Sequence, residues 1–377
     1  MDKRIGIISY HSDPNYGTMY QAYALAKVIR DLGGKPEYIR YESVPYRSPI
    51  KSKLISTIKR LLDVAGIYKT PKTEYSFLRT TQFKRLVKLY KEFHDTYIPT
   101  SKKVFYSNTA SEYTNDYDFF IVGSDQTWSP SCNLNPNSPN FLGFVTDNYK
   151  KRAYAPSIGT THISNDYLSR LIKELSKFEY VSCREYANSI MLSNLLDKHV
   201  RHVLDPTLLL KANDWESMEK PITMPKQFIL CYILGVKQCI SDYAEMLGKR
   251  KNLPVYYMLT RPEYSNKQNQ LVDISPEQFL WLLHHSSYVI TDSFHGTIFS
   301  INYNRNFYSF AKRVTDDVAG LDNDRIIDFL SLIGLQNRFI NDNEYRIEAD
   351  IDYTEVNNYL SNARDLSLNY LKRIISE

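Results

Sequence analysis

Small polar and charged residues follow short apolar runs at several places in this chain, in combinations that suit chemistry. The run 288–291 (YVIT) leads into Asp292, Ser293, His295 and Gly296. Aspartate and serine cap helices, glycine lets a backbone approach a ligand, and a helix start disfavours a charged imidazole. His295 is therefore predicted to act as a neutral base, or as a proton donor once an anionic ligand offsets the helix dipole. A capped helix with a hydrogen-bonded histidine is the alternative.

A second join of this kind follows the apolar run DFFIV at 118–122, which leads into Gly123, Ser124, Asp125 and Gln126. Hydroxyl, carboxylate and amide groups hydrogen-bond sugar hydroxyls, and Asp125 can accept a proton from an attacking hydroxyl. These side chains are therefore candidate substrate contacts. Ordinary helix caps after a strand are the alternative.

Two further turns carry glycine beside small polar side chains. Asn15 and Gly17 precede a helix predicted over Thr18–Leu32, whose first N–H groups are open to an anion. A dinucleotide fingerprint needs three spaced glycines, and this turn has only one, so a dinucleotide site is not expected. Ser157 and Gly159 stand in a similar turn after another strand-like run. A simple turn before a capped helix is the alternative.

One arginine stands directly after a buried-type run. Arg184 follows residues 180–183, at the place where a parallel strand presents its carboxyl end. A planar guanidinium suits a carboxylate or a phosphate if it points into a cleft. An ion pair with a nearby acid, such as Glu185 or Asp205, is the equally open alternative.

Asp322 and Asp324 stand in the order of a metal-binding DxD motif. No strand precedes them, so the favoured interpretation is that they cap the following helix, and no metal site is predicted. Arg325, with Lys312 and Arg313, supplies positive charge in the same region.

Composition restricts the class of protein. The 377 residues suffice for two domains, and 43% hydrophobic with 24% charged residues suits a normal soluble core. The net charge of +5 suits an anionic substrate or membrane surface and does not argue for nucleic acid. No signal peptide and no run near the ~20 apolar residues of a membrane helix is found. None of the cysteines has CxxC or zinc-ligand spacing, so reduced thiols in a cytoplasmic protein are expected. They are Cys132, Cys183, Cys231 and Cys239.

Strand-like and helix-like segments alternate, which predicts βαβ units around mainly parallel sheets. Strands are predicted at 4–10, 36–41, 118–122, 152–156, 180–183, 202–204, 228–234, 255–259, 288–291 and 306–310. Helices are predicted at 18–32, 165–177, 186–196, 241–250, 276–285, 297–302, 324–333 and 354–375. The predicted fold class is α/β, with two Rossmann-like doubly wound domains facing each other in a glycosyltransferase-B-like arrangement. Ligands in such folds lie beyond the carboxyl ends of the strands.

A proline-rich stretch marks the predicted division. Residues 205–225 hold three prolines, so an N-terminal α/β domain is predicted over 1–215 and a C-terminal Rossmann-like domain over 222–345. A last helix within 350–377 follows, with a return to the first domain as one outcome. A helical insertion is predicted over about 48–106.

Part of that insertion is both apolar and basic. Residues 48–69 place Ile50, Leu54 and Ile58 on one helical face, with lysines and an arginine beside them. A basic amphipathic helix can lie on an anionic membrane surface. A helix packed on its own domain is the favoured alternative.

The motifs also have a characteristic order. An Asn-x-Gly turn leads into QAYAL at 21–25, and GSDQxW, YAxSxG, SxRE, LDPT and DSFHG follow in that sequence. With these motifs the chain resembles the polysaccharide pyruvyl transferase family, over about residues 4–338.

The resemblance implies a glycosyltransferase-B-like fold and transfer of pyruvate from phosphoenolpyruvate to a sugar. The product is a cyclic ketal, phosphate is released, and the setting is cell-surface or exopolysaccharide biosynthesis. His295 matches the family's catalytic histidine, and Arg184 matches an arginine that holds the donor. Several members carry Arg-Leu-His where this chain has Ser293-Phe294-His295, so the role of that arginine must be filled from elsewhere.

The resulting expectations are specific. The predicted catalytic residues are His295, Arg184 and Asp125. The predicted substrate-binding residues are Asn15, Gly17, Ser124, Gln126, Ser157, Gly159, Asp292, Ser293, Gly296, Thr297 and Arg325. No cofactor is expected beyond phosphoenolpyruvate as donor, and the acceptor is a glycan or a lipid-linked sugar.

Two points stay open. The protein is expected in the cytoplasm, with peripheral contact at the inner face of the membrane through 48–69 as an added outcome. The rival functions are a nucleotide-sugar glycosyltransferase of the same fold and a catalytically inactive sugar-binding homologue.

Overall fold

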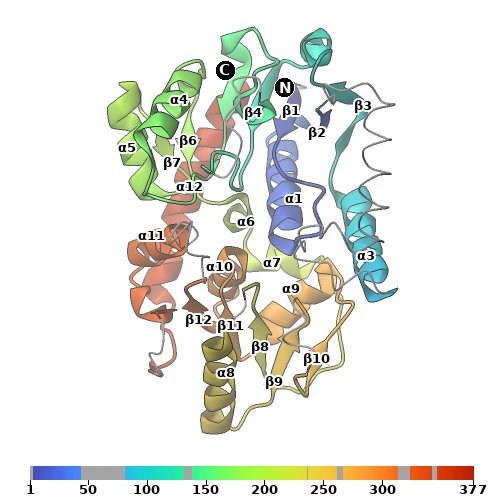
Figure 1. Cartoon of the computed structure of the whole chain (residues 1–377), viewed down its shortest axis with the longest axis vertical. Helices are drawn as coiled ribbons and strands as arrows, with labels where there is room; N and C mark the ends of the chain where they lie inside the picture. Colours follow the sequence, from blue (N-terminus) through green and yellow to red (C-terminus); the bar gives the residue numbers. More distant parts are fainter. Residues whose placement is uncertain are drawn as a thin grey trace, which may run out of the picture.

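The structure is a computed structural model, and it describes residues 3–43, 81–130, 138–235, 237–260, 266–312, 323–341 and 346–377. It contains two parallel β-sheets placed one above the other along the long axis of the molecule (Figure 1). The amphipathic segment predicted at 48–69 lies outside the described residues, as do Cys132, Arg313 and Asp322.

The first sheet has the strand order of a Rossmann fold. Its order is β3-β2-β1-β4-β5, and every pairing is parallel. The strands are β1 (Arg4–Ile8), β2 (Lys35–Glu42), β3 (Thr100–Tyr106), β4 (Phe119–Val122) and β5 (Lys151–Ala153). A short parallel pair, β6 (Ser182–Cys183) with β7 (Arg201–His202), adjoins β5 through a bridge between Arg152 and Tyr180.

The second sheet repeats this order and adds one strand. Its order is β10-β9-β8-β11-β12-β13, which is 3-2-1-4-5-6 when counted within the sheet. The strands are β8 (Ile229–Tyr232), β9 (Val255–Met258), β10 (Gln270–Leu271), β11 (Tyr288–Thr291), β12 (Asn306–Phe310) and β13 (Phe339–Ile340). Because both sheets are parallel and doubly wound, the predicted α/β fold with two Rossmann-like units is confirmed.

The helices follow the strands in alternation, as the apolar spacing predicted. The larger ones are α1 (Tyr16–Asp31), α3 (Thr81–Tyr97), α4 (Asn165–Leu175), α5 (Tyr186–Leu196), α8 (Gln238–Lys251), α9 (Pro276–His285), α10 (Phe294–Asn302), α11 (Asp324–Leu332) and α12 (Thr354–Ser376). No helix within the described residues combines the length and the apolar character of a membrane span.

One sequence prediction is wrong in detail. Residues 100–106 were assigned to a helical insertion, but they form β3, the edge strand beside β2. Ser101 and Phe105 of this strand are buried, whereas Lys102 and Lys103 between them are exposed. The proline-rich stretch 205–225, where the domain division is predicted, begins with two short helices, α6 (Pro206–Leu209) and α7 (Ala212–Glu216).

An aromatic cluster joins the two halves. Tyr16 and Tyr20 of α1 pack against Phe279 of α9, and the Tyr16 ring also lies 5.9 Å from that of Tyr232 at the end of β8. The hydroxyl of Tyr16 donates to the carbonyl of Ile274 at 2.8 Å. Large rings with one polar end suit such a junction, because each buries apolar area and still satisfies its hydroxyl.

The last helix runs beside both halves (Figure 1). Near its end, Tyr370 donates to the carbonyl of Ala153 in β5 at 3.0 Å. Nearer its start, Arg364 donates to Asn302 at the end of α10 at 2.8 Å. The helix α12 therefore contacts elements of both sheets.

Candidate active site

The carboxyl ends of the two sheets meet at His295 and Gly17. His295 lies in the first turn of α10, which follows β11, and Gly17 lies in the first turn of α1, which follows β1. A Cβ atom added to Gly17 would lie 2.0 Å from Nδ1 of His295. Only glycine lets the imidazole take this place, so the Asn15–Gly17 turn and the run that carries His295 form one feature.

A carboxylate lies on the other side of this imidazole. The Nε2 atom of His295 is 3.7 Å from Oδ2 of Asp205, and it has no hydrogen-bond partner among the described residues. Burial lowers the pKa of His295, and the nearby charges of Asp205 and Asp125 only partly oppose this. The imidazole is therefore neutral at neutral pH, and a neutral imidazole can accept a proton.

Asp205 also pairs with Arg184. The Nη1 atom of Arg184 donates to Oδ2 of Asp205 at 2.8 Å, and both side chains are almost fully buried. Burial raises the pKa of Asp205, but the charges of His295 and Arg184 and the bonds donated by Thr207 outweigh it, so the net pKa is lowered. Asp205 is therefore a fixed negative charge between an arginine and the imidazole.

The ion-pair alternative for Arg184 is confirmed, and its contact with a carboxylate or phosphate ligand stays a prediction. One edge of its guanidinium pairs with Asp205, and its Nε atom is 3.6 Å from Glu185. Its Nε and Nη2 atoms have no hydrogen-bond partner in the described part of the chain. The guanidinium also lies over the ring of Phe294, 4.3 Å from its centroid.

A second arginine approaches the same ring. The guanidinium of Arg325, in the first turn of α11, is 5.7 Å from the centroid of Phe294. Arg184, Arg325, Phe294 and Asp205 line a cavity of about 10 Å³, which is room for roughly one water molecule. Two guanidinium groups therefore converge on the start of α10.

Asp125 occupies an unusual backbone conformation at the end of β4. Its φ angle is 77°, in the left-handed region that favours glycine. Its Oδ1 accepts from the N–H of Gln126 at 2.9 Å, and its Oδ2 accepts from the hydroxyl of Thr18 at 3.2 Å. Strained positions of this kind cluster at functional sites. The neighbouring Ser124 donates to Asp205 at 3.1 Å, so this strand end joins the same network.

The turn after β5 is held by a buried acid. The hydroxyl of Ser157 donates to Glu185, which also accepts from the N–H of Ile158 at 3.1 Å. Gly159 has a φ angle of +82°, and a Cβ atom there would lie 3.0 Å from the amide nitrogen of Gln126. Ser157 is fully buried, and its hydrogen bond to Glu185 holds the loop in place.

The predicted residues around His295 form bonds within the second half of the molecule. Asp292 accepts from the N–H groups of Leu234 and Gly235, each at 2.7 Å. Burial raises the pKa of Asp292. Ser293 caps α10 by accepting from the N–H of Gly296 at 3.3 Å. These contacts shape the strand end on which His295 stands.

Two other predicted residues also contribute to helix geometry. Thr297 is buried and bonds the carbonyl of Ser293 and the hydroxyl of Ser309. Asn15 caps α1 by accepting from the N–H of Thr18 at 3.2 Å, so this helix begins two residues before the predicted start. Substrate contacts by these residues stay a prediction.

The expectation for Asp324 is wrong. It was interpreted as a helix cap, but it lies inside the first turn of α11, after Asn323. Its carboxylate accepts from the N–H and the hydroxyl of Thr161, at 2.8 and 2.7 Å. Asp328, one turn later, accepts from the N–H of Tyr186 at 2.7 Å. The helix α11 thereby binds two loops of the first half across the junction.

Sequence reasoning named Asp205 as one possible partner of Arg184 but missed its place beside His295. Its position in the Leu-Asp-Pro-Thr motif suits a helix cap, and it caps α6 through Oδ1 and the N–H of Thr207. A cap needs one carboxylate oxygen, and here the other oxygen receives Ser124 and Arg184. No sequence spacing gives this second function.

Comparison with known proteins identifies the family. The family model for polysaccharide pyruvyl transferase matches residues 15–312, which include Gly17, Asp125, Arg184, Asp205 and His295 but not the residues of α11. The chain belongs to the polysaccharide pyruvyl transferase family. Membership in this family implies a transferase. No curated protein matches the chain.

Solved structures give distant matches. An uncharacterised protein from Klebsiella pneumoniae is 15% identical with a TM-score of 0.36, covering 70% of this chain and 85% of that one. A UDP-GlcNAc 2-epimerase from Neisseria meningitidis bound to UDP-GlcNAc is 12% identical with a TM-score of 0.49, covering 99% and 100%. An Anabaena protein in complex with UDP and glucose is 10% identical with a TM-score of 0.44, covering 99% and 98%.

Proposed function

We propose that this pyruvyl transferase family member transfers pyruvate from phosphoenolpyruvate to two hydroxyls of a sugar, forming a cyclic ketal in cell-surface polysaccharide synthesis. The observation that carries the proposal is the buried His295, held between Gly17 and Asp205 where the two sheets meet. We expect no cofactor beyond this donor, and we place the reaction in the cytoplasm.

The donor has a carboxylate and a phosphate, and both need cationic partners. Arg184 has two guanidinium nitrogens that make no bond in the described residues, and its planar fork suits either group. The guanidinium of Arg325 also lies near the ring of Phe294. We assign to Arg325 the charge that several family members supply from the position of Ser293, because the Ser293 side chain caps its own helix.

The chemistry requires proton transfers that balance. His295 delivers a proton to C3 of the enol, which leaves positive charge at C2, and a sugar hydroxyl bonds to C2. The C2–O bond to phosphate breaks, and the second hydroxyl closes the ring at C2. Of the two hydroxyl protons, one ends on the new methyl group and the other on phosphate.

The electrostatics of the site suit this role for His295. Its imidazole is neutral in the free protein because burial lowers its pKa. A bound anionic donor stabilises the charged imidazolium of His295. The imidazole therefore takes up its proton when the donor binds, which is when the reaction needs it. Asp205 orients and stabilises that cation, and Asp125 accepts a hydroxyl proton.

Binding of phosphoenolpyruvate also requires the contacts between α11 and the first half to open. The cavity beside Arg184 holds about one water molecule and is smaller than phosphoenolpyruvate. The bonds from Thr161 and Tyr186 to α11 close this side of the junction. We infer that these contacts separate when the donor enters and re-form around it.

The direct test is incubation with phosphoenolpyruvate and a panel of free and lipid-linked sugars. The expected result is phosphate release together with an acceptor product heavier by one pyruvate minus one water. Release of a nucleotide from nucleotide sugars, with no reaction of phosphoenolpyruvate, would show a glycosyltransferase instead. Sugar binding without turnover of either donor would show an inactive homologue.

A further inference from the structure

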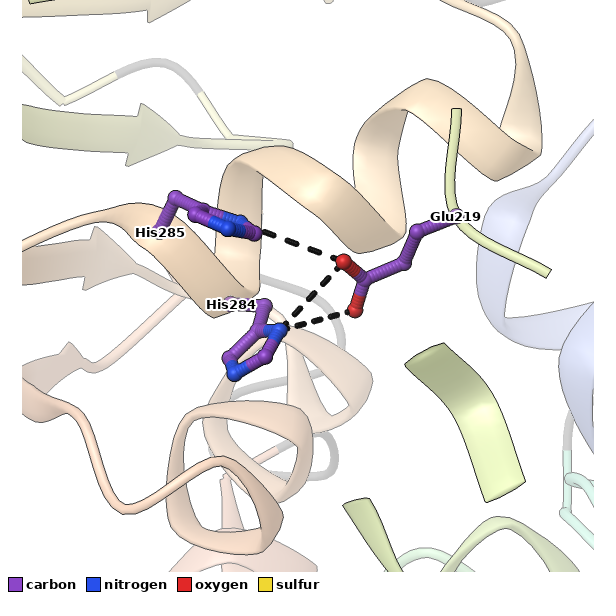
Figure 2. Close-up of side chains that lie close together, drawn as sticks. All are labelled: Glu219, His284 and His285. Carbon is purple, nitrogen blue, oxygen red and sulfur yellow. Dashed lines mark hydrogen bonds and ion pairs between the residues drawn. The ribbon is translucent and has the colours of Figure 1, made fainter. Parts of the chain in front are cut away.

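Three side chains with metal-ligand chemistry converge at the far end of α9, away from His295. Figure 2 shows His284 and His285, the last residues of α9, both facing the carboxylate of Glu219. Glu219 belongs to the segment that leads from α7 to β8. Their ligand atoms all lie within 4.8 Å of one another, and Nδ1 of His284 is 3.0 and 3.3 Å from the two carboxylate oxygens.

The spacing suits a shared tetrahedral ion. Bonds of about 2.0–2.1 Å from zinc to nitrogen and oxygen place neighbouring ligand atoms about 3.4 Å apart. The His284–Glu219 distances of 3.0 and 3.3 Å lie just below this value, and the ligand atoms of all three residues lie within 4.8 Å of one another. His285 would bind through Nε2, because its Nδ1 donates to the Trp281 carbonyl. Small side-chain shifts would therefore complete the site.

Both imidazoles are held in place by stacking. The ring of His284 lies 4.6 Å from that of Tyr303 with an interplanar angle of 12°. The ring of His285 lies 4.3 Å from that of Trp281 with an angle of 15°, and the Trp281 carbonyl is 3.0 Å from its Nδ1. Ligands that are already oriented lose little freedom when an ion binds.

The electrostatics also favour a cation. The Glu219 side chain is only 7% exposed, and its ion-pair partners among the described residues are these two imidazoles, which are charged only when protonated. The carboxyl end of α9 adds the negative end of a helix dipole. A divalent cation would therefore supply the positive charge that this nearly buried carboxylate needs.

We propose that Glu219, His284 and His285 bind a divalent transition-metal ion, with zinc as the best chemical fit and water as the fourth ligand. Mixed nitrogen and oxygen ligands favour such ions over magnesium or calcium, which prefer oxygen alone. The ion is structural. It ties the segment between the two sheets to α9, while His295 stands at the opposite end of α10 from Tyr303.

The test uses tag-free, full-length protein treated with a chelator and then titrated with zinc. We expect one ion per chain by calorimetry, and a rise in melting temperature on the order of 4 °C at a hundredfold excess over Kd. Cobalt as a spectroscopic substitute should give the visible absorption of a tetrahedral site. Absence of zinc binding, or cobalt spectra of an octahedral aquo ion, would overturn the proposal.

Matched variants locate the ion. His284→Ala and Glu219→Gln should each weaken zinc binding at least about tenfold, whereas His199→Ala, at an exposed histidine elsewhere, should leave it unchanged. If either variant unfolds, His285→Asn replaces it in the test, because the His285 side chain is 43% exposed and its substitution should leave the fold intact. Equal affinity in all four proteins would place the ion elsewhere and overturn the assignment, whatever the transferase assay gives.

Discussion

The two sheets have the same strand order, yet their carboxyl edges are built differently. The first edge supplies the buried charges Asp205 and Arg184 and the half-buried Asp125, which bond one another or their neighbours across several loops. At the second edge, Asp292 bonds backbone within its own half, and His295 projects toward the first edge.

This difference shows what a repeated fold does and does not provide. Parallel strands bring polar residues to both edges, because turns and helix caps need them there. Only the partners decide which of these residues remain available for chemistry. One aspartate, Asp292, is occupied by two backbone N–H groups, while another, Asp205, holds an arginine beside an imidazole.

The largest expected effect comes from removing the imidazole of His295, the side chain at the second edge to which we assign proton transfer. His295→Ala should lower pyruvyl transfer by about a hundredfold to ten-thousandfold, because general acid–base catalysis contributes that much. Turnover is measured as phosphate release, with circular dichroism to check the fold. Gly17→Ala should cause a comparable loss, because its new methyl group displaces the imidazole. Near-normal turnover in both variants would remove His295 from the mechanism.

The next effect concerns the charges of the first edge. Asp205→Ala leaves Arg184 buried without its partner, which should lower the free energy of unfolding by about 3–5 kcal/mol. Urea denaturation measures the change. The double variant Asp205→Ala with Arg184→Met removes both charges and should recover much of the stability. If the double variant is no more stable than Asp205→Ala, the pair is not the cause.

A third effect is a pH dependence at the first edge. Burial, with the charge of His94 beside it, lowers the pKa of His11 to about 4, and the ring also faces Tyr38. The unfolded chain binds this proton near pH 6.5, so stability is full above that pH and falls as the pH drops towards 4, by roughly 3 kcal/mol. His11→Asn should flatten the unfolding free energy across this window. An unchanged slope would mean that other groups dominate.

A smaller effect separates charge from shape at the donor site. Arg184→Lys keeps a positive charge but loses the planar fork, so KM for phosphoenolpyruvate should rise roughly tenfold. Initial rates at varied donor concentration give this value. The acceptor KM should stay constant and serves as the internal control. Unchanged donor saturation would count against a donor contact by Arg184.

The smallest effect tests whether Ser293 has kept any donor role. Ser293→Ala removes the N-cap of α10 and should cost about 1 kcal/mol of stability, with no change in donor KM. Thermal unfolding and donor saturation measured together separate the two roles. A raised donor KM at normal stability would show that Ser293 contacts the donor.

Much of the fold could be predicted because its signals are local. The capping box of Ser275 and Gln278, with Pro276 at the first helical position, fixes the start of α9. The apolar run 288–291 forms β11 over the predicted residues. The edge strand β3 was missed because three residues, Lys102, Lys103 and Val104, separate its buried Ser101 and Phe105, so the alternation of apolar and polar residues typical of a strand is lacking.

The features of the candidate site fall into two groups, those set by local sequence and those set by tertiary contacts. The sequence by itself determined the α/β class, the alternation of strands and helices, the placement of polar residues after strands and the position of His295 at a helix start. All of these depend on residues close together in the chain. The tertiary structure alone decided that Gly17 must be glycine, since the atom it avoids belongs to a residue almost three hundred positions away. It also decided that Asp205 joins Arg184 to His295, because burial and partners across the junction are set only when two distant strand ends meet.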